Sequence, residues 1–263
     1  MNKLSKTIGA ALLGLTLGVS NVAAEKIHIV VEDFAPFNYM EDGEFKGIAP
    51  AIVKELISRV DSEVSMEMLP WKRGYKMAHD NANTGIYSML RTSVREDEFQ
   101  WVGPLYSARE YIFMRTGEEI EVNSLNDLKK LGSIAAQAGG GLHQMLVKHG
   151  LTNIMEVHDV NRLATMLVRG RTDALAIADL GLAHELKKLG KENGTVTPVM
   201  FFGEARLYLG FSKKTSKTEI AKWTTAYAAM KADGTLDKIR AQYVPDAQDW
   251  HADQISEIDA YSF

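Results

Sequence analysis

From Ser88 to Tyr106 the chain reads SMLRTSVREDEFQWVGPLY. The pattern predicts a strand over residues 84–89 that runs into a short polar helix carrying Arg91 and Arg95. A guanidinium forks onto a carboxylate through two charge-assisted hydrogen bonds, and backbone N–H groups at a helix start add donors to the same anion. The two arginines therefore indicate a carboxylate-binding site, unless both simply solvate a helix face beside the three acidic residues that follow.

The N-terminus has the layout of a secretory signal peptide. Lys3 and Lys6 form a basic start, an uncharged apolar run follows from Ile8 to Val19, and residues 22–24 offer small side chains for cleavage. The apolar run is too short to cross a bilayer core of roughly 30 Å as a helix. We therefore expect residues 1–24 to be removed and the remaining chain, which begins near Glu25, to be exported to the periplasm.

Composition narrows the class of partner. The chain has no cysteine, which excludes a disulfide and a cysteine-linked lipid. Removing residues 1–24 takes away two lysines and no acidic residue, so the net charge changes from −4 to −6. A mildly acidic protein is a poor candidate for binding nucleic acid. We expect a monomer without nucleic-acid partner, metal or cofactor.

Strands and helices are predicted to alternate along the chain. The predicted strands are 27–31, 64–68, 84–89, 111–114, 133–136, 154–157, 173–177, 196–200 and 206–211. The predicted helices are 50–60, 71–79, 124–131, 141–150, 160–169, 179–189, 216–230 and 236–243. This order is typical of an α/β fold with mainly parallel strands. The simplest arrangement is two α/β lobes linked by strand crossings near 112–116 and 205–209.

Five short segments stand in a recognisable order. They are Pro36-Phe37-Asn38-Tyr39 followed by Gly47, residues 92–106, Gln137-Ala138-Gly139, Gly170-Arg171-Thr172-Asp173-Ala174 and residues 231–236. Together they resemble the bacterial extracellular solute-binding proteins of family 3, the polar amino acid class, over essentially the whole chain after residue 24. The resemblance implies a two-lobed periplasmic-binding-protein (Venus flytrap) fold, with lobe 1 formed by 25–112 and 209–263 and lobe 2 by 113–208.

The resemblance also implies roles for individual residues. Arg95 matches the arginine that grips the α-carboxylate of a ligand, Ser88 matches a strand-end residue beside it, and Phe34 matches an aromatic residue that contacts the ligand. Gly140 and Gly141 stand where the family usually has a Ser/Thr pair, so that only their backbone N–H groups can serve the anion. The full set of predicted ligand-binding residues is Phe34, Trp71, Arg73, Ser88, Leu90, Arg91, Arg95, Gly140, Gly141 and Asp179.

Trp71 and Arg73 resemble a Trp-x-Arg found in one branch of the family. The alternative interpretation makes Trp71 a core aromatic residue and Arg73 a surface charge. Lys72, Arg73, Arg91 and Arg95 would place up to four cations near one cleft. Such a cleft favours an acidic or multiply anionic ligand.

The chain lacks acidic residues at two places where the family usually has them. After Gly47 it reads Ile-Ala-Pro-Ala, which cannot pair with an ammonium group. The second-lobe aspartate that usually holds the α-amino group is expected at position 178, but the chain has Ala178 there, followed by Asp179. A one-residue bulge could restore the contact through Asp179, or the contact is missing, or Asp179 caps the helix that follows.

These features predict a non-catalytic receptor that captures a small carboxylated ligand, an amino acid or a related organic acid, between two lobes and delivers it to the permease of an ABC importer. One alternative is a dehydratase-like enzyme on the same fold. Glu32, Asp33 and Glu204 are carboxylates available to it, but no pairing marks them and no metal or nucleophile motif occurs. A second alternative is a ligand-sensing receptor for a signalling or chemotaxis partner.

Overall fold

The computed structural model describes residues 26–118, 120–243 and 256–257, so the predicted signal peptide lies outside the described residues. The strands are β1 (Lys26–Val31), β2 (Tyr39–Glu41), β3 (Glu44–Lys46), β4 (Glu63–Met68), β5 (Thr84–Leu90), β6 (Phe99–Arg115), β7 (Ile134–Gln137), β8 (Ile154–Val157), β9 (Ala174–Ala178), β10 (Val196–Ser212) and β11 (Ser256–Glu257). The helices are α1 (Ile48–Arg59), α2 (Trp71–Asp80), α3 (Leu125–Leu128), α4 (Gly141–Lys148), α5 (Leu163–Val168), α6 (Asp179–Lys188), α7 (Lys217–Ala232) and α8 (Thr235–Tyr243), with 3-10 turns at Val160–Arg162 and Asn193–Thr195. No helix in the described ranges has the length and apolar character needed to span a membrane.

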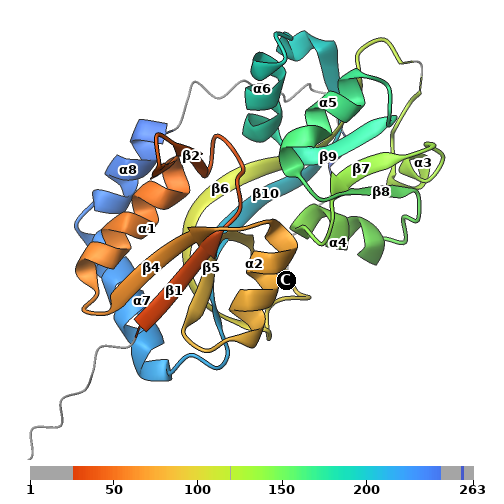
Figure 1. Cartoon of the computed structure of the whole chain (residues 1–263). Helices are drawn as coiled ribbons and strands as arrows, with labels where there is room; N and C mark the ends of the chain where they lie inside the picture. Colours follow the sequence, from red (N-terminus) through yellow and green to blue (C-terminus); the bar gives the residue numbers. More distant parts are fainter. Residues whose placement is uncertain (1–25, 119, 244–255, 258–263) are drawn as a thin grey trace, which may run out of the picture.

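One continuous sheet runs through the molecule in the order β4-β1-β5-β10-β6-β9-β7-β8, with β11 beside β10. The first lobe is built from β1, β4, β5, α1, α2, α7 and α8, and the second from β7, β8, β9, α3, α4, α5 and α6. The long antiparallel strands β6 and β10 run through both lobes, as Figure 1 shows. The predicted two-lobed α/β arrangement with two crossing strands is therefore confirmed.

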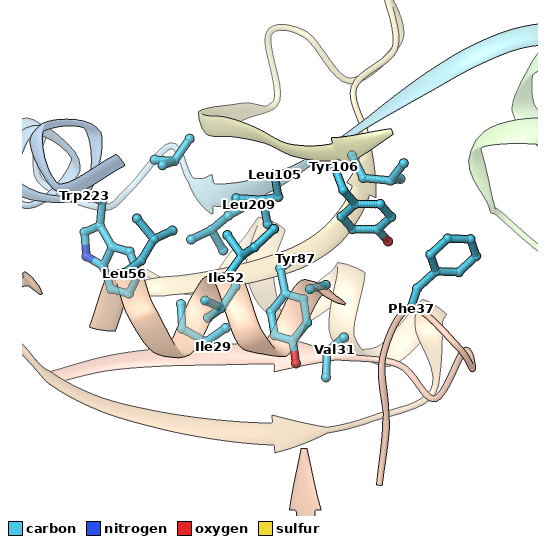
Figure 2. Packing of buried hydrophobic residues seen from close by; sticks show 14 of the residues in the cluster. Ile29, Val31, Phe37, Ile52, Leu56, Tyr87, Leu105, Tyr106, Leu209 and Trp223 are labelled. Carbon is cyan, nitrogen blue, oxygen red and sulfur yellow. The ribbon is translucent and has the colours of Figure 1, made fainter. Parts of the chain in front are cut away.

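Side-chain alternation along β1 distributes the core of the first lobe over both faces of the sheet. Ile27, Ile29 and Val31 face a cluster that includes α1, α7 and α8, whereas Val30 faces α2. Figure 2 shows Leu56 of α1 in the same packing as Ile29. The second lobe repeats the plan, with one buried cluster under α5 and α6 and another under α3 and α4.

The crossing strands are longer than the sequence pattern predicts. We expected separate strands at 111–114, 196–200 and 206–211, but β6 and β10 each extend over 17 residues. The pairing continues through register shifts, one of which sets residues 103–105 opposite Tyr208. Gly103 and Pro104 are absorbed there as an irregularity in a continued ladder.

The proposed residue boundaries of the lobes fall inside these two strands. Strand β11 pairs with β10 at Met200 and Phe201, a part of the chain that the proposed division gives to lobe 2, although it gives residues 256–257 to lobe 1.

The prediction of a helix that carries Arg91 and Arg95 is wrong. Residues 91–98 form turns, in which the backbone N–H of Arg95 donates to the carbonyl of Thr92 at 2.9 Å and that of Glu98 donates to Arg95 at 3.0 Å. Thr, Ser and Val have modest helix propensity, and only eight residues separate β5 from β6. Successive tight turns instead bring Arg95 back under the end of β5.

Candidate functional site

A cavity of about 70 Å³ lies between the two lobes. Its lining from the first lobe and the crossing strands comprises Glu32, Phe34, Trp71, Ser88, Leu90, Arg95, Glu110 and Leu207. Its lining from the second lobe comprises Gln137, Gly140, Gly141, Leu142, His143, Val160, Leu163, Ala176, Ile177 and Ala178. Seven of the ten predicted residues are thus brought together, and three, Arg73, Arg91 and Asp179, lie elsewhere.

Arg95 is the cation of the cavity and is completely buried. Its Nη1 donates to the carbonyl of Leu90 and its Nη2 to the carbonyl of Gly139, both at 3.0 Å. The guanidinium carbon lies 5.3 Å from the ring centre of Trp71 and 5.2 Å from that of Tyr75, within cation–π range. Burial lowers the pKa of Arg95 to about 10, so the group stays charged at neutral pH. Its buried Nε has no hydrogen-bond partner among the described residues.

Trp71 combines the two roles that the sequence left open. Its ring is buried in the packing between α2 and the sheet, and it also lines the cavity. Its Nε1 donates to the carbonyl of Gly139 at 3.0 Å, the same oxygen that accepts from Arg95. One second-lobe carbonyl therefore receives two hydrogen bonds from the first lobe. Arg73, two residues further on, is exposed and does not line the cavity.

Ser88 is held in place at the cavity wall. Its hydroxyl donates to Oδ1 of Asn38, a fully buried residue whose Nδ2 donates to the carbonyl of Glu32 at 2.8 Å. Ser88 also has a positive φ of 57°, which is uncommon for a residue with a side chain. Such backbone outliers concentrate at ligand-contacting positions, where the surroundings hold them.

Glu32 and Glu110 bring two carboxyl groups to the cavity. Oε2 of Glu32 accepts from Nε2 of Gln137 in the second lobe, whereas the buried Oε2 of Glu110 has no hydrogen-bond partner in the part of the chain that the structure describes. Burial raises the pKa of Glu32 to about 8, with the Gln137 hydrogen bond opposing it. Burial also raises the pKa of Glu110 to about 8, and the charge of Asp179 adds to the effect.

Sequence reasoning missed Glu110. It lies on β6 in alternation with the buried Ile112 and Met114. An acidic residue on the apolar face of a strand is rare in a protein core. That pattern is the signal that could have found it, but we had begun the strand at position 111.

Arg91 turns away from the cavity. Its guanidinium binds Glu96, with Nε 2.7 Å from Oε2, and it lies 5.6 Å from the ring centre of Trp101 and 5.3 Å from that of Tyr208. Lys72, another predicted cation, pairs with Glu156 of the second lobe at 3.3 Å. Arg95 is the only lysine or arginine among the cavity-lining residues that the structure describes. The expectation of an acidic or multiply anionic ligand therefore loses its basis.

Asp179 begins α6 and faces Arg109. Its buried Oδ2 lies 2.8 Å from Nε and 2.7 Å from Nη2 of Arg109, and its Oδ1 accepts from the N–H of Leu180 at 2.7 Å. Desolvation raises the pKa of Asp179, and the charge of Arg109 opposes that shift. Both residues line a second cavity beside Tyr106 and Leu180. Ala178, and not Asp179, borders the cavity that contains Arg95.

The start of α4 closes the cavity from the second lobe. The N–H of Gly140 donates to the carbonyl of Gln137 at 2.9 Å, so it is already engaged within its own loop. Gly141 packs on Leu90 so closely that a side-chain carbon added at position 141 would overlap Cδ2 of Leu90. No group of three or more metal-ligating side chains is found in the part of the chain that the structure describes.

Comparisons with known proteins agree with this architecture. The model of the bacterial extracellular solute-binding proteins, family 3, matches residues 27–246. No curated protein matches the chain significantly.

Three solved structures illustrate the similarity of fold. A histidine kinase sensor domain with similarity to periplasmic binding proteins is 15% identical with a TM-score of 0.75, over 84% of this chain and 96% of that chain. The arginine-, lysine-, histidine-binding protein ArtJ from Geobacillus stearothermophilus is 16% identical with a TM-score of 0.71, over 86% and 99%. The ancestral amino acid-binding protein AncCDT-1, a precursor of cyclohexadienyl dehydratase, is 20% identical with a TM-score of 0.69, over 84% and 95%. With the family model matching most of the chain and the two-lobed fold in place, this protein belongs to the bacterial extracellular solute-binding proteins of family 3.

Proposed function

We propose that this protein is an exported receptor that encloses a small carboxylated ligand in the cavity between its lobes, with Arg95 binding the carboxylate. The observation that carries the proposal is a completely buried guanidinium on the cavity wall, whose Nε donor has no acceptor within residues 26–118, 120–243 and 256–257. A buried cation with an unsatisfied donor is costly to keep, and a carboxylate compensates both the charge and the donor.

The size of the cavity limits the ligand. A water molecule needs about 10–15 Å³ of cavity volume, so a cavity of about 70 Å³ holds roughly five to seven groups of that size. This favours a compact amino acid or hydroxy acid over a long basic one. ArtJ, with the same fold, is described as binding arginine, lysine and histidine, which are larger.

Several contacts join the lobes around the cavity. Besides the two hydrogen bonds to the Gly139 carbonyl, Gln137 donates to Glu32 and Lys72 pairs with Glu156. A ligand that touches both walls adds contacts available only in the closed arrangement. It therefore shifts the population toward the closed state, which a membrane partner can distinguish from the open one.

The closed receptor would deliver its ligand to the permease of an ABC importer. A sensory output is the alternative, since a histidine kinase sensor domain shares the fold with a TM-score of 0.75. Both outputs use the same binding chemistry. The two outputs can be distinguished by a pull-down, in which the ligand-loaded protein is tested for binding to the permease and sensor proteins encoded beside its gene.

A dehydratase-like enzyme is the second candidate function. The observation that favours it is the pair of cavity carboxyl groups, Glu32 and Glu110, whose pKa values of about 8 suit a general acid near neutral pH. Incubation of the protein with the ligand, followed by mass spectrometry, tests it. A receptor returns the ligand unchanged, whereas an enzyme yields a product lighter by one water.

The test of the receptor proposal is calorimetric titration of compact amino acids and organic acids into wild type, Arg95→Lys and Arg91→Lys. Because Arg95 makes charge-assisted hydrogen bonds worth about 1.5–3 kcal/mol, Arg95→Lys should weaken binding roughly 10- to 100-fold. Arg91→Lys is the matched control from the same segment and should bind as wild type does. Equal affinity of Arg95→Lys and wild type would remove Arg95 from the site.

A further inference from the structure

The missing aspartate at position 178 has a counterpart on the neighbouring strand. In the antiparallel pairing of β6 with β9, Glu110 lies directly opposite Ala178. Side chains of directly opposed residues emerge on the same face of a sheet, with Cβ atoms about 4.5–5.5 Å apart. Both residues line the cavity. The carboxyl group of Glu110 thus enters the cavity beside the methyl group of Ala178.

The surroundings of Glu110 leave it in need of a donor. Its buried Oε2 has no hydrogen-bond partner among the described residues, whereas Glu32, the other acidic residue of the cavity lining, accepts from Gln137. Asp179 cannot take over the role in this arrangement, because its carboxylate binds Arg109 and faces the second cavity. A buried acceptor without a donor is destabilising, and an ammonium group offers three donors and a compensating charge.

The cavity therefore carries both a cation and two acidic side chains. Arg95 provides the cation, and Glu110 and Glu32 provide the acidic groups. A ligand that carries only a carboxylate binds Arg95 and leaves the carboxyl group of Glu110 without a donor. A ligand that carries both a carboxylate and a primary amine satisfies both.

We propose that Glu110 is the residue that binds the amino group of a compact amino acid ligand, in place of the acid that the chain lacks at position 178. This assignment rests on the proposed receptor function, in which Arg95 binds the carboxylate. Glu32 stands beside it as the second acidic group of the cavity, fixed by Gln137.

Ligand binding in this arrangement should release a proton. The pKa of Glu110 is about 8 in the protein without ligand, so the group is mostly protonated at pH 7. A bound ammonium favours the ionised form, and binding at pH 7 should release a proton. The charged and titratable groups that act on the two carboxyls are Asp179 on Glu110, and Asp33, Arg95 and Asp159 on Glu32, with His143 also lining the cavity.

The experiment compares matched ligands. Glycine, L-alanine and L-serine are titrated calorimetrically beside acetate, propionate and 3-hydroxypropionate, their counterparts without the amino group. The proteins are wild type, Glu110→Gln and Glu204→Gln, the last being an exposed carboxylate on β10 that serves as control. Each titration is repeated in phosphate and in Tris, whose different ionisation enthalpies report the protons released.

Wild type and Glu204→Gln should bind an amino acid at least 10-fold more tightly than its counterpart and release close to one proton at pH 7. Glu110→Gln should lose 10-fold or more of its affinity for the amino acid, keep its affinity for the counterpart within about 3-fold, and release no proton. Equal binding of both ligand sets by wild type would overturn the role of Glu110 while leaving the receptor function intact, and this comparison does not depend on the folding of any variant. Unchanged amino acid binding by Glu110→Gln would overturn it as well. Failure of wild type to bind any of the six ligands would overturn both proposals.

Discussion

Leu90 at the end of β5 packs directly on Gly141 at the start of α4, across the boundary between the lobes. A carbon added at Gly141 would overlap Cδ2 of Leu90 and lie 3.0 Å from its Cβ. The φ of Gly141 is not positive, so a side chain there meets a steric obstacle and no backbone strain. Because the two residues belong to different lobes, the obstacle acts on closure.

Gly141→Ala should therefore weaken ligand binding without unfolding either lobe. Overpacking of a close contact costs about 1–3 kcal/mol, which corresponds to roughly 5- to 150-fold in affinity. Titration calorimetry measures the loss, and small-angle scattering should show a more open particle in the presence of ligand. Gly194→Ala is the control, since a carbon added at this exposed glycine meets nothing within 4 Å.

Leu90→Ala provides the complementary test. In the double variant with Gly141→Ala the smaller side chain makes room for the added methyl group, so part of the affinity should return. A double variant no better than Gly141→Ala would show that the contact does not limit closure.

Stability should fall as pH rises from about 5.5 to 8. Glu32 and Glu110 have pKa values of about 8 in the folded protein and an ordinary value of 4.5 when exposed. In that interval the folded protein therefore binds more protons than the unfolded chain, and stability decreases with rising pH. Urea unfolding at the two pH values should show a loss on the order of 3 kcal/mol for each of the two carboxyl groups in wild type.

The double variant Glu32→Gln/Glu110→Gln distinguishes the contribution of these two carboxyl groups to the pH dependence of stability from that of the histidines. His184 acts in the opposite direction, because burial lowers its pKa and the fold loses stability as pH falls. Since glutamine does not titrate, the variant should lose less stability than wild type between pH 5.5 and 8. Identical pH dependence in both proteins would contradict the burial of the two carboxyl groups.

Trp71→Phe should weaken closure while keeping the aromatic packing. The variant removes the indole hydrogen bond to the Gly139 carbonyl, a contact worth about 0.5–1.5 kcal/mol. We expect ligand affinity to fall about 2- to 10-fold by calorimetry. Trp101→Phe is the matched control, because the indole of Trp101 donates to Glu96 within one lobe, at 3.1 Å. An equal effect of both variants would assign the loss to general destabilisation.

Most of the element order could be predicted because it depends on local signals, whereas the role of Arg95 was predicted from the resemblance to the family. Alternating apolar residues mark β1 and β4, and Arg95 stands in the segment 92–106, which resembles the family. The direction in which a side chain points could not be predicted in the same way. Arg91 is four residues from Arg95, yet its neighbours Trp101 and Tyr208 come from two other strands and draw it away from the cavity.

The acidic side of the cavity depends on still more distant relationships. Glu110 faces the cavity because β6 continues past the register shift opposite Tyr208 and then pairs with β9, which no local pattern encodes. The contact of Gly141 with Leu90 likewise exists only once the two lobes are placed together.

Asp179→Asn distinguishes the two carboxylates that could hold an amino group. Asp179 pairs with Arg109 outside the Arg95 cavity, so its loss should lower the unfolding free energy by about 1–3 kcal/mol and leave amino acid affinity within about 2-fold of wild type. Glu110→Gln should show the reverse, with weak binding and a stable fold, because glutamine has the shape of the protonated carboxyl group that predominates at pH 7 and carries no charge to desolvate. Urea unfolding measures the unfolding free energy of each variant, and calorimetry measures its affinity for the amino acid. If Asp179→Asn weakened amino acid binding tenfold and Glu110→Gln did not, the amino contact would belong to Asp179, and the arrangement of β9 and α6 would have to change when ligand binds.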